Sequence, residues 1–223
     1  MTRRRQSDEE RLFALQEALG DPSTTWGEVL NRLVFCPDGL VLERALELVE
    51  AVVERWPAAT RAPSRFVLRQ LMAGHVRPYL RLLRVLDIRP LHPIRDRNAL
   101  LRRMIREGGV RELQTFRARY SDGDQLIDTL LRSIHGLQVI YIGGSHVGPA
   151  AAQALAQSPS MSGLRYLSLH NNSIGDGGAE ALLASPYLRE LRWLNLYRNG
   201  ISGALRDAIK RAPQWQGAQI ILG

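Results

Sequence analysis

The C-terminal part of the chain repeats one pattern of apolar residues at a constant interval. Its clearest copy, Leu-x-x-Leu-x-Leu-x-x-Asn-x-Ile, begins at Leu164. A second copy begins at Leu191 and a weaker one at Leu137, so successive copies start 27 residues apart. A repeat of about 20–29 residues is typical of stacked units, each with one strand and one helix. Because one unit cannot bury its own apolar face, its neighbours must supply the core. The sequence therefore predicts an α/β solenoid in this region.

The repeat resembles the leucine-rich repeat family, and within it the ribonuclease-inhibitor-like class. Asn172 and Asn199 fill the asparagine position, and the segment 175–182 that follows the clearest strand has helical character. The resemblance implies a short solenoid with parallel strands inside, helices outside, and asparagine amides that bond backbone groups in the turns. Ser145 stands at the asparagine position of the weaker copy, where its shorter side chain can pair with fewer groups.

Counting the same interval in both directions extends the repeat. Upstream, the count reaches Val110 and predicts a degenerate first unit, with Ala118 at the asparagine position and a helix over 124–134. Downstream, residues 218–222 predict a short final strand. Terminal units are expected to be irregular because they act as caps. We therefore expect a leucine-rich repeat domain over residues 110–223.

Residues 1–109 show helical periodicity interrupted by proline and glycine. Ser7 followed by acidic residues is typical of a capping box, and Gly108 and Gly109 form a natural helix end. We expect a separate all-α domain that packs against the first strand and caps the solenoid. The expected helices cover residues 8–20, 24 or 25 to 35, 40–56, 64–86 with a break near Gly74 or Pro78, and 95–107.

The residues that alternate with the buried positions of each predicted strand face the open, concave surface. Tyr and Trp fill four of these nine positions, although aromatic residues make up 6% of the chain. Their large apolar area and polar tips make them frequent binding hot spots. Packing between neighbouring strands is the alternative explanation for them. The nine positions are Val139, Tyr141, Gly143, Tyr166, Ser168, His170, Trp193, Asn195 and Tyr197.

The expected function is a non-enzymatic protein-interaction module, scaffold or adaptor that binds a protein partner on this concave face. The aromatic side chains would supply affinity, and His170 and Asn195 polar specificity. The expected partner-binding residues are Tyr141, Tyr166, Ser168, His170, Trp193, Asn195 and Tyr197.

Charge suggests a second function. The chain has a net charge of +8, and 29 of its 30 basic residues are arginine, a ratio typical of GC-rich bacterial coding. Residues 7–55 hold four arginines and eleven acids, whereas residues 61–106 hold twelve arginines and two aspartates. The basic segment could bind nucleic acid or an anionic membrane, unless the acidic helices neutralise it within one bundle. The candidate anion-binding residues are Arg77, Arg81, Arg84, Arg102, Arg103 and Arg106.

Catalytic and metal signals are weak. Cys36-Pro37-Asp38 looks like the Cys-x-Asp of bacterial leucine-rich-repeat ubiquitin ligases, but a buried, inert cysteine is the commoner state of a lone thiol. The five histidines show no metal-ligand spacing, and the glycine pairs match no phosphate or dinucleotide loop. We expect no enzyme activity, no cofactor and no metal.

Location and assembly follow from simpler features. No apolar run approaches the roughly 18–20 residues of a membrane span, and the basic start, residues 1–6, leads into acidic residues, which is unlike a secretory signal. The single cysteine, Cys36, suits a reducing compartment, so we expect a cytoplasmic protein. The final strand, residues 218–222, would leave an apolar edge that invites a second copy of the chain, unless Trp215 covers it or the strand is too short to pair.

Overall fold

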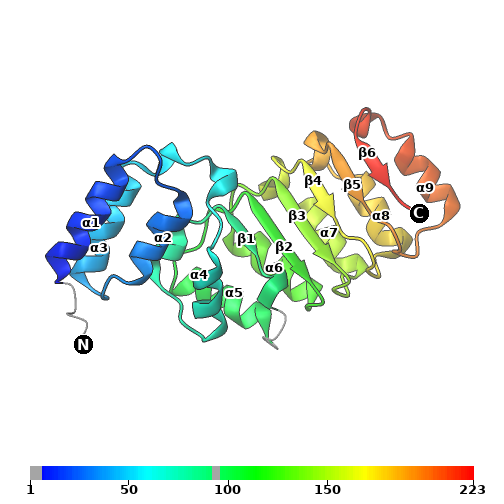
Figure 1. Cartoon of the computed structure of the whole chain (residues 1–223). Helices are drawn as coiled ribbons and strands as arrows, with labels where there is room; N and C mark the ends of the chain where they lie inside the picture. Colours follow the sequence, from blue (N-terminus) through cyan, green and yellow to red (C-terminus); the bar gives the residue numbers. More distant parts are fainter. Residues whose placement is uncertain (1–6, 92–95) are drawn as a thin grey trace.

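The computed structural model describes residues 7–91 and 96–223, which form a mixed α/β structure (Figure 1). Within these residues, six strands form one all-parallel sheet and follow one another across it in chain order. The strands are β1 (Val85–Asp87), β2 (Thr115–Arg119), β3 (Val139–Gly143), β4 (Tyr166–Ser168), β5 (Trp193–Asn195) and β6 (Gln219–Ile221).

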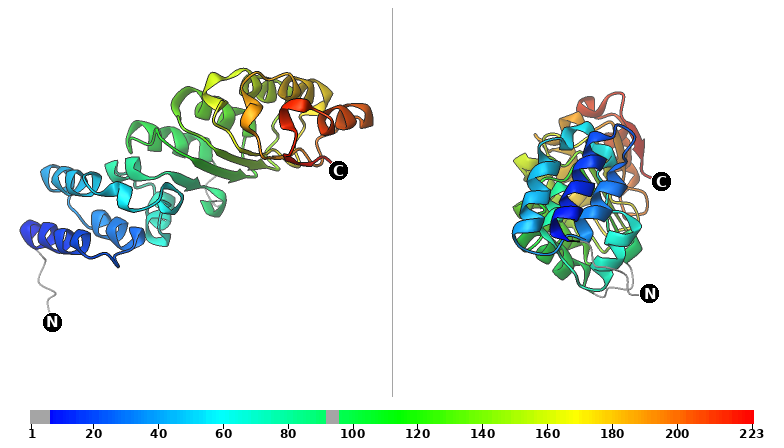
Figure 2. Two further views of the ribbon diagram at one scale, coloured as in Figure 1. Left: turned by 90° about the horizontal axis from the view of Figure 1, so that it is seen from above. Right: turned by 60° about the vertical axis from the view of Figure 1, so that its left-hand side comes forward.

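One α-helix lies between each pair of successive strands. Each of these helices packs against the next, and together they cover one face of the sheet (Figure 1, Figure 2). In the described part of the chain, the opposite face of the sheet carries no helix layer, and we call it the open face. The covering helices are α5 (Arg97–Arg106), α6 (Gly123–Ser133), α7 (Pro149–Gln157), α8 (Gly175–Leu183) and α9 (Gly203–Lys210).

Alternate strand residues form the core between the sheet and these helices. Phe116, Ile140, Leu167 and Leu194 lie in register across β2 to β5, and each is at most 2% exposed. Strand side chains point alternately to the two faces, so the residues between them reach the open face. The prediction that the leucine positions of the repeat face the interior is confirmed.

Asn172 joins two successive strand–helix units through its side-chain amide. Its Oδ1 accepts hydrogen bonds from the backbone N–H groups of Ser145 at 2.8 Å and Val147 at 3.1 Å. Its Nδ2 donates to the carbonyls of Ile142 at 2.8 Å and Leu169 at 2.9 Å. These groups lie at the end of β3 and in the turns that follow β3 and β4, so the amide pairs backbone groups of two successive units. The structural role predicted for the asparagine is confirmed.

The number of backbone groups paired at the asparagine position depends on the side chain that fills it. Asn199 donates to the carbonyl of Leu169 in the preceding unit at 2.8 Å. Ser145 instead donates to the carbonyl of Gly143 at 3.1 Å and accepts one hydrogen bond, from the N–H of Ser121, at 3.3 Å. The shorter side chain pairs with fewer backbone groups, as the sequence indicated.

The upstream units do not keep the spacing of the later ones. Phe116 lies in register with Ile140 after a shorter stretch of chain than the one that separates Ile140 from Leu167. Leu86 lies in register with Phe116 after a longer stretch. The assignment of Ala118 to the asparagine position is therefore wrong, because Ala118 is a fully buried strand residue. Connections between the strands differ in length, so a fixed count loses the register where a connection shortens or lengthens.

The segment 64–86 is not the single interrupted helix that we expected. Helix α4 (Arg65–Met72) ends just before Gly74, in line with the predicted break. The chain then makes a 3₁₀ turn over Pro78–Leu82 and enters β1. The sheet therefore begins upstream of the domain boundary expected at residue 109, and α5 belongs to the helix layer that covers it.

The earlier helices begin where the capping residues indicated. Ser7 and Glu10 form a capping box, and so do Thr25 and Glu28. The third helix ends at Glu50 instead of continuing to residue 56. The first residue expected in the helix over 95–107, Arg95, lies outside the described residues. The three helices are α1 (Asp8–Gly20), α2 (Trp26–Val34) and α3 (Leu40–Glu50).

The N-terminal helices meet the sheet through the chain at Arg61. The carbonyl oxygen of Arg61 accepts hydrogen bonds from the N–H groups of Arg84 at 2.9 Å and Val85 at 3.2 Å. Inside the sheet, the carbonyl of Arg165 accepts the corresponding pair from Arg192 at 2.8 Å and Trp193 at 3.1 Å. A residue outside the sheet thus continues the bonding pattern at the outer edge of β1.

Candidate functional site

The open face carries the aromatic side chains that the repeat predicted. Tyr166 and Trp193 lie opposite each other in register on β4 and β5, and the Tyr166 side chain is 44% exposed. Beside them is a hollow of about 450 Å³, within the size range of ligand pockets. We call it the aromatic hollow. It is lined by Arg117, Val139, Ile140, Tyr141, Tyr166, Ser168 and Trp193.

His170 follows β4 and closes one side of this group of residues. Its Nδ1 lies 3.1 Å from the Ser168 hydroxyl and its Nε2 lies 3.4 Å from the Tyr141 hydroxyl. The imidazole and the Tyr141 ring are 5.0 Å apart between their centres. Ser168 is 1% exposed, so its side chain is buried and not on the surface as we expected. The His170 ring is hydrogen-bonded to Ser168 and therefore limits the access of a partner to the Ser168 hydroxyl.

Burial lowers the pKa of His170 below its ordinary value of 6.5, and the positive charge of Arg119 lowers it further. Both effects disfavour the imidazolium, so the neutral ring is the stable form at pH 7. A neutral imidazole has one donor and one acceptor nitrogen, which suits its two hydroxyl neighbours, Ser168 and Tyr141. His170 therefore acts here as a polar neutral group.

Asn195 and Tyr197 lie farther along the sheet and do not line the aromatic hollow. The side chain of Asn195 accepts a hydrogen bond from the backbone N–H of Tyr197 at 2.9 Å, which fixes the turn after β5. Tyr197 is 39% exposed, and the guanidinium of Arg198 lies 5.2 Å from its ring centre. The structure thus gathers Tyr141, Tyr166, Ser168, His170 and Trp193, with Asn195 and Tyr197 at the margin.

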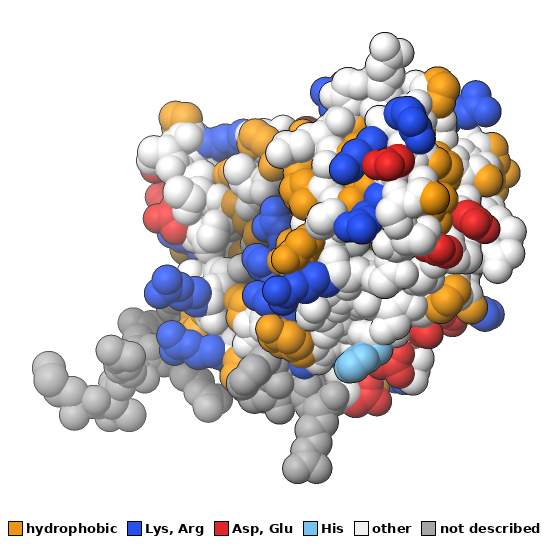
Figure 3. All heavy atoms as spheres, turned by 90° about the vertical axis from the view of Figure 1, so that its right-hand side faces the viewer, with side chains coloured by type: hydrophobic (Ala, Val, Ile, Leu, Met, Phe, Trp, Pro, Cys, Tyr) orange, Lys and Arg blue, Asp and Glu red, His pale blue; other side chains and the backbone are white. Residues whose placement is uncertain are grey.

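Two arginines beside the aromatic hollow, Arg117 and Arg89, were not expected from the sequence. Arg117 lines the hollow from β2, in register with Tyr141. The guanidinium of Arg89 lies 5.4 Å from the Tyr141 ring centre and forms an ion pair with Asp87. Figure 3 shows basic and hydrophobic side chains interleaved where the molecule is hollowed. Arg117 and Arg119 alternate with buried residues, and this alternation could have identified them in the sequence. The constant count placed this unit in the wrong register and so concealed them.

The arginines proposed for anion binding are mostly paired with acids. Arg77 contacts Asp38 at 2.8 Å, and Arg81 contacts Glu50 at 2.7 Å. Both acids belong to the acidic N-terminal segment, so neutralisation between helices accounts for these arginines better than a free anion site does. Three further candidates also have carboxylate partners: Arg84 with Glu112, and Arg103 and Arg106 with Glu107.

Arg102 is the exception among the six candidates. It has no carboxylate within ion-pair distance among the described residues, and it lines a separate hollow between α5 and α6. That hollow also contains Asp124 and Asp128, whose carboxylates oppose the binding of an anion. The structure therefore does not bring the six arginines together into one cationic surface.

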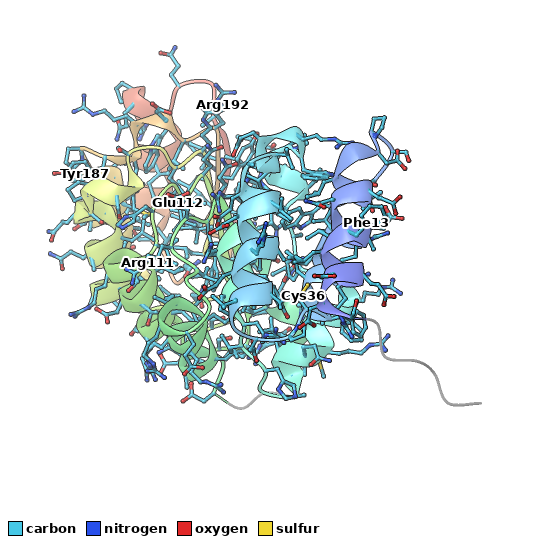
Figure 4. All side chains as sticks on the ribbon, turned by 90° about the vertical axis from the view of Figure 1, so that its left-hand side faces the viewer. Phe13, Cys36, Arg111, Glu112, Tyr187 and Arg192 are labelled. Atoms are coloured by element: carbon cyan, nitrogen blue, oxygen red, sulfur yellow. The ribbon has the colours of Figure 1, made fainter. Side chains whose placement is uncertain are left out.

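Cys36 lies among the N-terminal helices (Figure 4). It is 3% exposed, and its thiol donates to the carbonyl of Arg32 at 3.6 Å. Burial raises the pKa of the thiol, which reduces the thiolate that a nucleophile requires. This environment is typical of an inert structural cysteine.

The C-terminal edge of the sheet is formed by the short strand β6. Among the described strands, β6 pairs with β5 alone, and it lies within the short final strand predicted over residues 218–222. Trp215 is 2% exposed, and its indole N–H donates to the carbonyl of Leu188 at 2.7 Å. Trp215 thus packs inside the last unit, while Ile220 and Ile221 remain partly exposed.

No protein-family model and no curated protein matches this chain. Across residues 7–91 and 96–223, no helix combines the length and the apolar character needed to span a bilayer. In the same residues, no three His, Cys, Asp or Glu side chains gather where they could hold a metal ion.

Proposed function

We propose that this chain is a leucine-rich repeat protein of the ribonuclease-inhibitor-like class, built as a short solenoid. Support comes from the alternation of strands and helices in chain order and from the Asn172 and Asn199 hydrogen bonds between units. In this proposal the solenoid begins with β1, and helices α1 to α4 form its N-terminal cap. The cap is supported by the carbonyl of Arg61, which occupies the outer edge of β1.

The proposed function is a non-enzymatic adaptor or scaffold that binds a protein partner on the open face. The observation that carries it is the pair formed by the exposed Tyr166 and the partly exposed Trp193, which line the aromatic hollow. Exposed aromatic residues cost solubility unless a partner covers them, and large rings next to a concavity provide binding energy. The buried state of Cys36 supports a role without thiol chemistry.

Cellular location and self-association are secondary parts of the proposal. A cytoplasmic location is supported by the lone, buried thiol of Cys36, since disulfides are rare in reducing compartments. A homodimer through β6 is supported by the single neighbour of that strand within the described sheet. Light scattering on the whole chain, with and without residues 218–223, tests the dimer.

A titration against a partner captured from the native host tests the proposed function. Tyr166→Ala and Trp193→Ala should each weaken binding by about 2 kcal/mol or more, the range of interface hot spots. Phe13→Ala is the matched control, because Phe13 is a 61% exposed aromatic residue on α1 in the N-terminal helices (Figure 4). The proposal is wrong if both open-face variants bind as tightly as the Phe13 variant.

A further inference from the structure

The charged strand positions of the open face lie at one end of the row of aromatic residues. Arg117 and Arg119 project from β2, while Tyr166 and Trp193 lie on β4 and β5. The strand positions in register with Arg117 on β3, β4 and β5 are uncharged. The face therefore has a cationic end over β2 and an apolar end over β4 and β5.

The cationic end has more positive than negative charge available. Asp87 is the acidic residue in register with Arg117, and it already accepts two hydrogen bonds from Nε of Arg89, at 2.9 and 3.0 Å. Among the described residues, neither Arg117 nor Arg119 has a carboxylate within ion-pair distance. An arginine guanidinium pairs with a carboxylate through two parallel hydrogen bonds, and this charge-assisted pairing is stronger than a neutral hydrogen bond. The charge of this end is complementary to an anion.

The separation of the two ends sets the spacing within a ligand. Neighbouring strands lie about 4.8 Å apart, so β2 and β4 are separated by about 10 Å. An extended peptide in the polyproline II conformation rises about 3.1 Å per residue and has three residues per turn, so side chains three positions apart lie on the same side, about 9 Å apart. A carboxylate over Arg117 would therefore belong to a residue about three positions from the side chain that enters the aromatic hollow.

Single-stranded nucleic acid fits these observations less well. It needs several free cations along its backbone and free ring faces on which bases stack. The Tyr141 ring already has Arg89 against it at 5.4 Å, and the Tyr197 ring has Arg198 at 5.2 Å. Two arginines without a carboxylate partner and one pair of free rings suit a peptide with one acid and one apolar anchor.

We propose that the open face binds an extended acidic peptide segment, with an Asp or Glu on Arg117 and a large apolar side chain in the aromatic hollow. The acid and the apolar residue are about three positions apart. This inference rests on the proposed function, because it names the kind of protein segment that the open face takes. Arg119, two residues farther along β2, adds positive potential around the same carboxylate, whereas the charge of Arg89 is already balanced by Asp87.

A displayed library of random peptides provides the test. The library is selected on the whole chain and counter-selected on the Tyr166→Ala/Trp193→Ala double variant, so that the retained peptides depend on the aromatic hollow. We expect these peptides to be enriched in Asp or Glu about three positions from an aromatic or large aliphatic residue. Arg117→Gln should weaken binding of such a peptide about tenfold, the loss expected for one charge-assisted hydrogen bond.

The matched control is Arg132→Gln, which removes the same charge from α6 in the helix layer. Peptides that need Tyr166 and Trp193 but carry no acid, or that bind the Arg117 variant unchanged, refute the acidic-peptide inference and leave the proposed function standing. If no peptide depends on the two rings, the inference is also refuted, and the partner titration alone then judges the proposed function. Oligo(U) or oligo(dT) that binds more tightly than the peptides, and is weakened by Tyr166→Ala, assigns the face to nucleic acid instead.

Discussion

The imidazole of His170 occupies the space into which a side chain at position 143 would project. A Cβ atom added to Gly143 would lie 2.1 Å from Cε1 and 2.6 Å from Nε2 of His170. Gly143 is the last residue of β3, and the ring comes from the turn after β4. The missing side chain on one strand therefore makes room for the polar ring contributed by the next.

Gly143→Ala should lower the free energy of unfolding by roughly 1–3 kcal/mol, the cost of overpacking a filled site. The imidazole can turn outward, but it then loses its contacts with Ser168 and Tyr141. Urea unfolding measures the change. Gly177→Ala is the control, since nothing lies within 4 Å of its added Cβ. In the His170→Ala background, adding Gly143→Ala should cost little further stability, because the ring that it would meet is gone. Additive losses of the two single changes would contradict the steric explanation.

Asn172→Ala should destabilise the chain by roughly 2–4 kcal/mol, because it leaves several turn N–H and carbonyl groups without their partner. The side chain of Asn195 accepts a single hydrogen bond from a nearby N–H, so Asn195→Ala should cost clearly less. Denaturant unfolding of both variants makes the comparison. Equal losses at the two positions would show that the bonds between units do not dominate.

Stability should fall as the pH falls from about 7 towards 5, and His170 should contribute to this loss. Its pKa in the folded chain lies below the ordinary value of 6.5, so the unfolded chain takes up the proton first as pH falls. Where the unfolded state binds more protons, stability decreases with decreasing pH. His170→Gln should flatten the dependence in a series of unfolding measurements. A steeper dependence in the variant would contradict the lowered pKa.

Cys36 should react with iodoacetamide only when the helical region opens. The thiol is buried and its pKa is raised, so the native chain at pH 8 should react at least about 100-fold more slowly than the urea-unfolded chain. Intact mass over time follows the adduct. Fast, stoichiometric labelling of the native chain would revive the possibility of a reactive cysteine.

The regular repeat units were predictable because every level of the sequence agrees there. In β3 to β5 the leucine positions, the asparagines and the following helices share one spacing, so the core and the open-face aromatic residues followed directly. Strand β1 was missed because the apolar residues around it, Leu80, Leu83 and Leu86, are also spaced like one face of a helix. A strand as short as β1 is too brief to correct that reading.

The site was predictable only where the register was. Tyr166 and Trp193 belong to units of constant spacing, and their position on the open face was expected from alternation alone. Arg117 belongs to a unit with a shortened interval before the next strand, so a constant count placed it out of line with Tyr141. The burial of Ser168 under His170 depends on the missing side chain at Gly143, a contact between units that alternation within one strand cannot reveal.

The carbonyl of Arg61 also makes the two ends of the sheet different. It takes the place of a preceding strand at one end, so that end cannot be lengthened without displacing the N-terminal helices. At the other end, β6 has a single neighbour among the described strands. Each asparagine amide bonds backbone groups of its own unit and of the unit before it, so the asparagine of a duplicated copy of residues 164–190 would find the same backbone groups in the unit before it. Duplication within the gene can therefore add strand–helix units after β1 and leave the N-terminal helices and β1 unchanged.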